Sequence, residues 1–214
     1  SRGLGDVYKR QGYYRGSPLG ELSGWTLSLW FEAKSDKKGD LFGIVRNENN
    51  GEAYRLTYAN GTLTFGDPKQ KKGAWKLLVK GVEKEEWNHL VISYAQATGP
   101  AIYLNAEKMA QGGRGQMGYA TKFDHYHFGA AVHGKGKYGD YFDGKIDDFE
   151  LHNRPFDEEE VKQLQKGSSF GGSLVAFNDF ENVNHRELAY FNSAEPDDDY
   201  LEAGRKLYLQ NCTA

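Results

Sequence analysis

Hydrophobic and polar residues alternate with a period of two along much of the chain. In residues 26–32 the apolar side chains Leu27, Leu29 and Phe31 occupy every second position, so they share one face of an extended strand. The same analysis predicts further strands at residues 41–46, 53–59, 62–66, 75–80, 87–95, 101–105, 126–131, 145–152 and 173–181. Strands with one apolar face must pack as a sandwich or close into a barrel.

Turn and cap residues indicate how these elements are joined. Asn60 and Gly61 separate two predicted strands and are a strong signal for a two-residue hairpin. One helix is predicted before the last strand, because Asp157 is a good N-cap and Glu160 follows three residues later, as in a capping box. Gly167 is the residue expected just after the end of this helix.

Composition agrees with an all-β domain and argues against nucleic acid as a partner and against a membrane span. The 214 residues include 27 Gly, 14 Tyr, 12 Phe and 4 Trp, and aromatic strands broken by glycine turns are typical of sandwiches and barrels. A net charge of -3 does not favour nucleic acid as a partner. No apolar run approaches the length of a transmembrane helix, so no membrane span is predicted. The single cysteine, Cys212, excludes an internal disulfide.

Three stretches resemble the laminin-G-like (concanavalin A-like lectin/glucanase) family of jelly-roll domains. They are SGWTLSLWF at residues 23–31, EWNHLVISY at residues 86–94 and FDGKIDDFELHNRPF at residues 142–156. The resemblance spans residues 12–181 and implies a two-sheet antiparallel jelly-roll sandwich with one short helix. Trp30 and Trp87 are expected in its core, His89 as a satisfied, half-buried residue, and the segment 174–180 at a sheet edge.

Both ends of the chain suggest sequence outside this domain. Residues 1–11 resemble translated sequencing-adapter DNA, and residues 182–199 are expected to form a linker. Residues 200–214 resemble the first helix of a c-type cytochrome, with Gly204, Leu207, Tyr208 and Cys212 in the family's order. That resemblance implies a truncated cytochrome domain in which Cys212 is the first cysteine of a C-x-x-C-H haem attachment motif. A terminal helix with an incidental cysteine is the alternative.

No catalytic residues are predicted. Glycosidases of this fold carry Glu-x-Asp-x-Glu, or a version one residue longer, on a single strand, and no such string occurs. Asp148 and Glu150 are two residues apart and share a strand face, where solvated carboxylates are the simpler interpretation. His125 and His127 also share a face, but zinc needs a third ligand that the spacing does not supply.

One loop has the composition of a ligand site. It contains His133, Tyr138, Asp140, Tyr141 and Asp143, and aromatic faces beside carboxylates suit sugars. Asp140 and Asp143 are also candidate calcium ligands, since calcium prefers several oxygen donors in a loop. The alternative is that these are ordinary surface-loop residues that bind no ligand. A second exposed aromatic candidate is Trp75, beside a lysine-rich turn.

Together these features predict a non-catalytic module that binds a glycan or an extracellular protein. The C-terminal resemblance implies that the intact parent is an exported multidomain c-type cytochrome with haem c and an electron-transfer role. It also implies a periplasmic, cell-surface or secreted location. The alternatives are a glycoside hydrolase of the concanavalin-like fold and a structural spacer.

Overall fold

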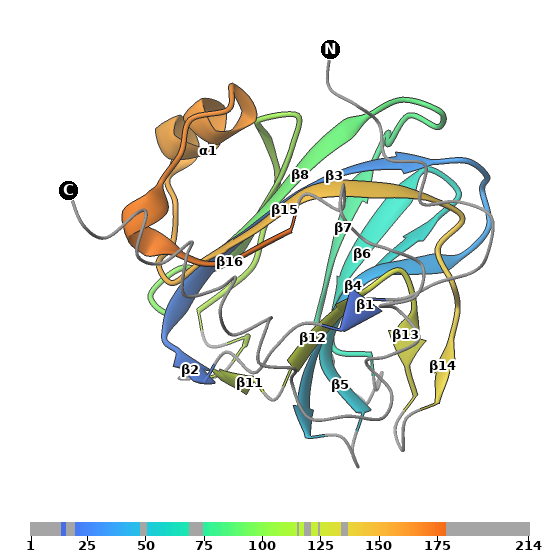
Figure 1. Cartoon of the computed structure of the whole chain (residues 1–214), viewed down its shortest axis with the longest axis horizontal. Helices are drawn as coiled ribbons and strands as arrows, with labels where there is room; N and C mark the ends of the chain where they lie inside the picture. Colours follow the sequence, from blue (N-terminus) through green and yellow to red (C-terminus); the bar gives the residue numbers. More distant parts are fainter. Residues whose placement is uncertain are drawn as a thin grey trace, which may run out of the picture. The chain divides into compact units, whose positions relative to one another are not determined.

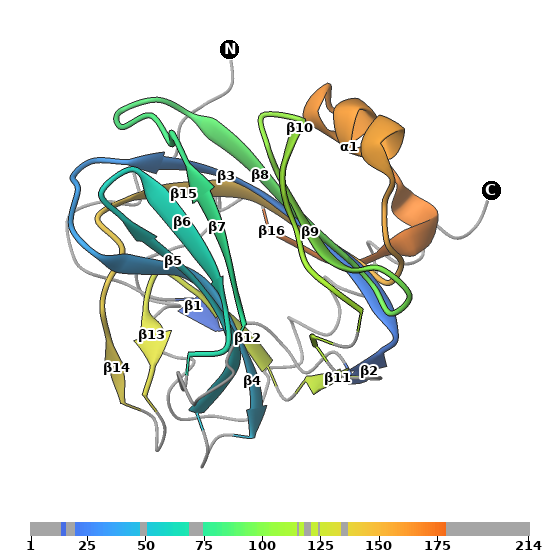
Figure 2. The same cartoon turned by 180° about the vertical axis from the view of Figure 1, so that it is seen from behind.

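Two antiparallel sheets form the sandwich of the computed structural model (Figures 1 and 2). The structure describes residues 14–15, 20–47, 51–68, 75–114, 116–117, 121–123, 125–133 and 137–178, all within one unit that spans Ser1–Asn182. Residues 1–11, 182–199 and 200–214, Cys212 included, lie outside the described residues. No described helix is long and apolar enough to cross a membrane.

The first sheet is called here the β4 sheet. In spatial order it contains β1 (Tyr14–Arg15), β12 (His125–Phe128), β4 (Gly39–Asn47), β5 (Gly51–Ala59), β6 (Thr62–Gly66) and β7 (Lys76–Lys80). The second, the β3 sheet, contains β10 (Glu107–Gln111), β9 (Gly99–Leu104), β8 (Asn88–Ala95), β3 (Gly24–Ala33), β15 (Gly144–His152) and β16 (Leu174–Asn178). Two small pairs join β2 (Gly20–Leu22) to β11 (Thr121–Phe123) and β13 (Ala131–Val132) to β14 (Tyr138–Gly139). The predicted jelly-roll architecture is confirmed.

The core lies between the inner faces of the two sheets. Leu27, Leu29 and Phe31 of β3 are fully buried, which confirms the face predicted from their spacing. Aromatic rings join the two layers, since Phe128 of the β4 sheet lies 4.5 Å, centroid to centroid, from Phe149 of the β3 sheet. Burial of such side chains is the main favourable contribution to folding.

Two tryptophans expected in the core lie outside it. Trp30 alternates with Leu29 and Phe31, so it faces away from the core and is half-buried on the outer face of the β3 sheet. Trp87 is also half-buried, and the Lys145 ammonium lies 5.7 Å from its ring centroid. The fully buried tryptophan is Trp25, which shares the inner face of β3.

Helix α1 (Glu158–Gln165) covers part of the outer face of the β3 sheet. The predicted capping box is confirmed, because the Asp157 carboxylate accepts from Glu160 N at 2.9 Å and Glu160 Oε2 accepts from Asp157 N at 3.1 Å. Gly167, at φ +86°, ends the helix as predicted. A small second core lies beneath it, formed by Val91, Ala101, Tyr103, Phe156, Val161 and Leu164.

Hydroxyl groups of the β3 sheet hold the segment that leads into α1. The Phe156 amide lies 2.8 Å from Thr26 Oγ1 and 2.9 Å from Ser93 Oγ. Thr26 Oγ1 donates to Arg154 O at 2.9 Å, and Ser93 Oγ donates to Phe156 O at 2.8 Å. These bonds satisfy buried polar groups where the chain crosses the sheet.

The predicted closing strand pairs with an edge of the β3 sheet. Strand β16 runs antiparallel to β15, with Glu150 opposite Phe177. It therefore covers the hydrogen-bonding groups on one side of β15, as expected for this segment.

A β-bulge in β15 shapes the outer face of the β3 sheet. Asp147 opposes Trp30 and Glu150 opposes Ser28, so one extra residue lies in β15 between these pairs. Asp148 adopts a left-handed conformation there, with φ +45°. The extra residue shifts the alternation of β15, so that Ile146 and Phe149, three positions apart, both belong to the core. Glu150 therefore lies on the outer face, opposite Ser28.

His89 is a deeply buried polar residue on that outer face. It is 1% exposed, its Nε2 lies 2.8 Å from Ser28 Oγ, and its ring lies 4.8 Å from that of Trp30. Its Nδ1 has no hydrogen-bond partner among the described residues. The expectation of a satisfied, half-buried histidine was therefore wrong. Burial lowers the pKa of His89 to about 4, because desolvation disfavours the charged imidazolium.

Truncation of the aromatic core is expected to be strongly destabilising. Phe149→Ala removes a fully buried ring that contacts Phe128 across the sandwich, and the expected loss is about 3–5 kcal/mol of unfolding free energy. Leu78→Ala, at a side chain that is 53% exposed, serves as the control and is expected to cost less than about 1 kcal/mol. Denaturant unfolding measures both, and equal losses would contradict this core.

Stability is expected to fall in acid because of His89. Its pKa drops from 6.5 in the unfolded chain to about 4 in the folded protein. Between pH 6.5 and pH 4, His89 therefore binds a proton more readily in the unfolded chain than in the folded protein. The stabilising contribution is complete above pH 6.5 and is lost as pH falls toward 4, by about 3 kcal/mol in total.

Urea unfolding between pH 7.5 and pH 4 measures this contribution. His89→Gln should flatten the pH profile, whereas Phe177→Ala, at an exposed ring without a titratable group, should leave its slope unchanged. Parallel profiles for the wild type and His89→Gln would show that His89 is not the group responsible.

Candidate ligand site at the β13–β14 hairpin

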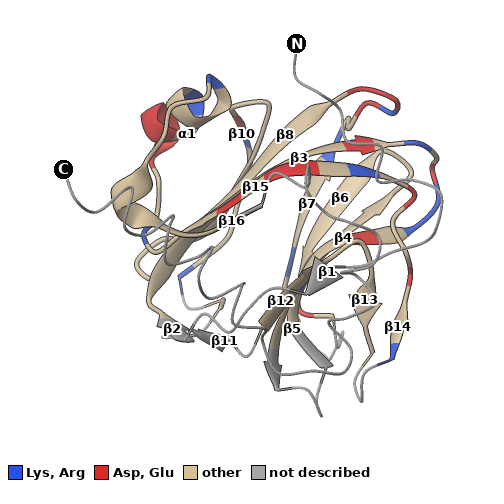
Figure 3. Ribbon diagram, viewed as in Figure 1, with Lys and Arg blue, Asp and Glu red and all other residues tan. Residues whose placement is uncertain are grey.

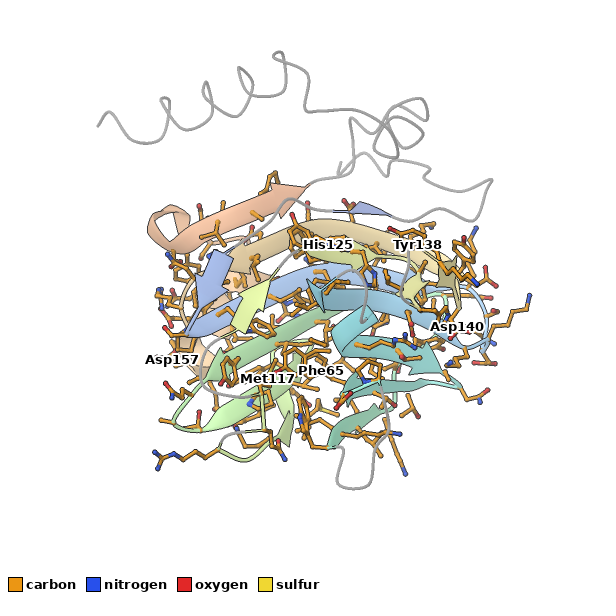
Figure 4. The ribbon with its side chains drawn as sticks, turned by 90° about the horizontal axis from the view of Figure 1, so that it is seen from below. Phe65, Met117, His125, Tyr138, Asp140 and Asp157 are labelled. Atoms are coloured by element: carbon orange, nitrogen blue, oxygen red, sulfur yellow. The ribbon has the colours of Figure 1, made fainter. Side chains whose placement is uncertain are left out.

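The predicted ligand loop forms a short hairpin beside the β4 sheet. Val132 of β13 pairs with Tyr138 of β14, and β13 contacts β4 and β5. Figure 4 shows Tyr138 and Asp140 toward one end of the sandwich, with Asp157, the N-cap of α1, toward the other end. His133, Tyr138, Asp140 and Tyr141 lie on or directly beside this hairpin. Their role as ligand-binding residues stays a prediction.

Asp140 is the most constrained residue of the hairpin. Its backbone is left-handed, with φ +46°, and its carbonyl accepts from Asp40 N at 2.8 Å. Its carboxylate accepts from Lys38 Nζ at 2.8 Å and lies 3.9 Å from His133 Nε2. The hydrogen bond from Lys38 is the main cause that lowers the pKa of Asp140, so this carboxylate is ionised at neutral pH.

Tyr141 and Asp143 are fixed to the start of β4 and the loop before it. Tyr141 forms an isolated parallel bridge with Asp40, and its side chain is half-buried. Asp143 accepts from Ser35 Oγ at 2.6 Å through Oδ2, and its carbonyl accepts from Lys34 N at 2.8 Å. The hairpin is therefore held by backbone and side-chain bonds to residues about a hundred positions earlier in the chain.

A buried ion pair supports the hairpin and was not foreseen. Asp40 is fully buried; its Oδ2 lies 3.1 Å from Arg55 Nε and its Oδ1 accepts from Thr57 Oγ1 at 2.6 Å. The predicted strand begins at Leu41 and does not include Asp40, whereas β4 begins at Gly39. Polar residues at alternate positions of β5, Arg55 and Thr57, were the available signal.

Trp75 does not belong to this site. It lies next to the start of β7, where its ring is 5.5 Å from Phe65 and 5.9 Å from Tyr54, centroid to centroid. It packs against the core and is half-buried, so the prediction of an exposed binding aromatic was wrong. The position of Trp75 is determined by its packing against the apolar inner face of the β4 sheet.

The donors at Asp140 and Asp143 do not fit calcium. Asp140 is bound by the cationic Lys38, and Asp143 is bound by Ser35. Calcium needs six or more oxygen ligands around one point. Across the described ranges, no cluster of three or more His, Cys, Asp or Glu side chains suits a metal ion. The haem prediction rests on Cys212, outside the described residues, and stays a prediction.

Comparison with known protein families shows which superfamily the domain belongs to. The family model for the concanavalin A-like lectin/glucanases superfamily, of laminin-G type, matches residues 13–162. The chain belongs to this superfamily. A search of curated proteins found no match to the domain.

Solved structures share the fold at low sequence identity. A heptameric SAP-like pentraxin from Limulus polyphemus aligns with a TM-score of 0.61 and 14% identity, over 82% of this chain and 89% of the pentraxin. A putative carbohydrate-binding protein from Bacteroides ovatus has a TM-score of 0.61 and 16% identity, over 80% of this chain and 51% of that protein. The CBM40 module of the Ruminococcus gnavus IT-sialidase, bound to α2,3-sialyllactose, has a TM-score of 0.54 and 12% identity, over 71% and 98%.

The buried ion pair is expected to support the concanavalin-like domain. Asp40→Ala removes the carboxylate that Arg55 and Thr57 contact, and the expected cost is about 3 kcal/mol of unfolding free energy. Lys84→Ala removes the exposed Lys84–Asp36 pair and should cost less than about 1 kcal/mol. Chemical denaturation of both variants tests this, and a negligible loss in Asp40→Ala would refute a supporting role.

Proposed function

We propose that this domain is a non-catalytic glycan-binding module and that the β13–β14 hairpin contacts the sugar. The observation that carries the proposal is that one hairpin and the residue after it hold two half-buried tyrosines, Tyr138 and Tyr141, beside the Asp140 carboxylate, which lies 3.9 Å from Nε2 of the exposed His133. Sugars stack their apolar faces on aromatic rings, while polar groups at the ring edges bond their hydroxyls.

The polar groups of the hairpin are suited to neutral and acidic sugars. The Asp140 carboxylate is an acceptor, while Lys38 Nζ, 56% exposed as a side chain, is a donor beside it. Because Lys38 compensates the charge of Asp140, the hairpin does not present a strong negative charge to an approaching ligand. The buried Asp40–Arg55 ion pair stabilises the strand to which the hairpin is bonded.

The comparisons support a binding role. The Ruminococcus module is described as bound to a sialylated sugar, and the Bacteroides protein as a putative carbohydrate-binding protein. Asp148 and Glu150 are the carboxylates whose spacing was considered as a glycosidase-like pair. Both lie on β15 of the β3 sheet rather than at the hairpin. A protein ligand, a hydrolase and a structural spacer are the competing functions.

The wider context of the module is also a proposal. An exported parent with a c-type cytochrome domain is supported by the resemblance of residues 200–214, and it implies haem c and a periplasmic, cell-surface or secreted location. DNA sequence downstream of Ala214 tests this. A Cys-His pair directly after Ala214 is expected, and its absence would contradict the cytochrome context.

Glycan binding is expected to depend on the two hairpin tyrosines. A glycan array that includes lactose and α2,3-sialyllactose should identify a ligand, and Tyr138→Ala and Tyr141→Ala should each weaken it by about tenfold or more, roughly the loss of one stacking contact. Phe177→Ala removes a 49% exposed ring on β16 and should leave the affinity unchanged. Isothermal titration calorimetry measures all four proteins.

The same experiment separates the competing functions. An array without any bound glycan would favour a spacer or a protein ligand, and release of new reducing ends from a bound glycan would favour the hydrolase. Equal affinity of the wild type and both tyrosine variants would remove the hairpin from the proposal.

A further inference from the structure

Exposed apolar side chains gather on β16, the edge strand of the β3 sheet. The described residues include five exposed large hydrophobic side chains, and three of them lie on β16. They are Leu174, Val175 and Phe177, which are 36%, 41% and 49% exposed. The other two lie on other edge strands, Leu78 on β7 and Met109 on β10. A group of exposed apolar side chains of this kind indicates an interaction surface.

The edge strands β7 and β10 carry charged residues that β16 lacks. Strand β7 begins with Lys76 and ends with Lys80, and β10 begins with Glu107 and Lys108. Such charges keep an edge strand from pairing with another chain. Antiparallel pairing of two β7 strands around Leu78, for example, would place Lys76 opposite Lys80. The sequence of β16, LVAFN, contains no charge, and Figure 3 shows charged positions on β10 but none on β16.

The backbone of β16 also has a side that no described strand covers. Among the described strands, β16 pairs with β15 alone, so the hydrogen-bonding groups on its other side have no strand partner there. Ala176 lies opposite Leu151 and packs against the core, whereas Phe177 lies opposite Glu150 on the outer face. A register shift adds Val175 to β16 without a partner in β15. The strand therefore presents both apolar side chains and a backbone edge.

We propose that two copies of this chain pair edge to edge through their β16 strands, around a two-fold axis. Such an axis makes the two strands antiparallel and gives both copies the same contacts. With Ala176 opposite its own counterpart, Val175 of each copy lies opposite Phe177 of the other copy. Pairs of an aromatic and a β-branched side chain are favourable across antiparallel strands. The strand is thus complementary to itself, and the two β3 sheets form one continuous sheet.

The charges beside β16 permit this pairing. Glu150 is the carboxylate opposite Phe177, and its Oε2 lies 3.0 Å from Nε2 of the buried His152. In the dimer, two β16 strands separate the two Glu150 residues, so about 14 Å, or three strand spacings, lies between their backbones. This distance exceeds the Debye length of about 8 Å at physiological salt, so repulsion between the two carboxylates is screened.

The pairing strand is short, so the dimer is weak. Strand β16 has five residues, whereas a stable interface uses roughly 20–30 residues on each side. We therefore expect association that depends on concentration rather than a permanent dimer. Tyr138 and Asp140 of the hairpin lie outside β16, so dimerisation and glycan binding are independent, and either proposal can fail without the other.

Sedimentation velocity of the full chain over a hundredfold range of concentration measures this association. The sedimentation coefficient is expected to rise from that of a monomer to that of a dimer and no further, because the two-fold pairing uses the free edge of both copies. Hydrogen exchange of the β16 amides should slow over the same range of concentration, since these groups then bond the partner strand.

Lysine substitutions on three edge strands test where the copies meet. Val175→Lys and Phe177→Lys change exposed side chains, so each variant should stay folded and dimerise about tenfold more weakly or worse. Leu78→Lys and Met109→Lys are matched controls at exposed apolar residues of β7 and β10, and both should dimerise like the wild type. Thermal unfolding checks that all four variants are folded.

A mixture of two variants tests the antiparallel register. When Phe177→Lys pairs with Val175→Glu, the new lysine lies opposite the new glutamate, and the unchanged valine and phenylalanine meet at the second position. The mixture should therefore associate about threefold more tightly than either variant alone, the contribution of an exposed cross-strand ion pair.

Four results would overturn the proposal. The first is a monomer at every concentration, and the second is a species that keeps growing beyond the dimer. The third is undiminished dimerisation of folded Val175→Lys and Phe177→Lys, or an equal loss in the controls on β7 and β10. The fourth is a mixture of Phe177→Lys and Val175→Glu that associates no more tightly than its components.

Discussion

The alternation of side chains along β3 is the constraint on which the rest of the structure depends. Leu27, Leu29 and Phe31 point into the sandwich and are fully buried, so the core fixes the orientation of the strand. A shift of one residue would exchange the two faces of β3. The outer face is then available for Thr26, which bonds the chain before α1, and for Ser28, which bonds His89. One strand thus positions the core, the segment before the helix and His89.

Two residues outside the core depart from regular strand geometry. At the hairpin, left-handed Asp140 turns the chain so that its carbonyl accepts from Asp40 N, which attaches the loop to β4. In β15, left-handed Asp148 lies in the bulge that shifts the alternation between Ile146 and Phe149. Residues other than glycine rarely adopt this left-handed conformation, and residues that do adopt it are concentrated at functional sites.

The sequence predicted features that depend on local order and missed those that depend on distant pairing. Strand β6, the Asn60–Gly61 turn and the Asp157 cap agree with prediction, because each follows from neighbouring residues. Loop composition alone suggested Tyr138 and Asp140 as ligand-binding residues, and that role stays a prediction. The Asp40–Arg55 pair depends on the register between β4 and β5, which no local pattern specifies. For the same reason the bulge at Asp148 and the burial of His89 were not foreseen, and Trp75 was misplaced.

A crystal structure of the protein with a glycan selected on the array tests most directly whether the hairpin is a sugar-binding surface. We expect an intact glycan with one sugar ring against Tyr138 or Tyr141 and a hydroxyl bonded to Asp140. Density for the glycan on another face of the sandwich, or for a cleaved product beside Asp148 and Glu150, would contradict it.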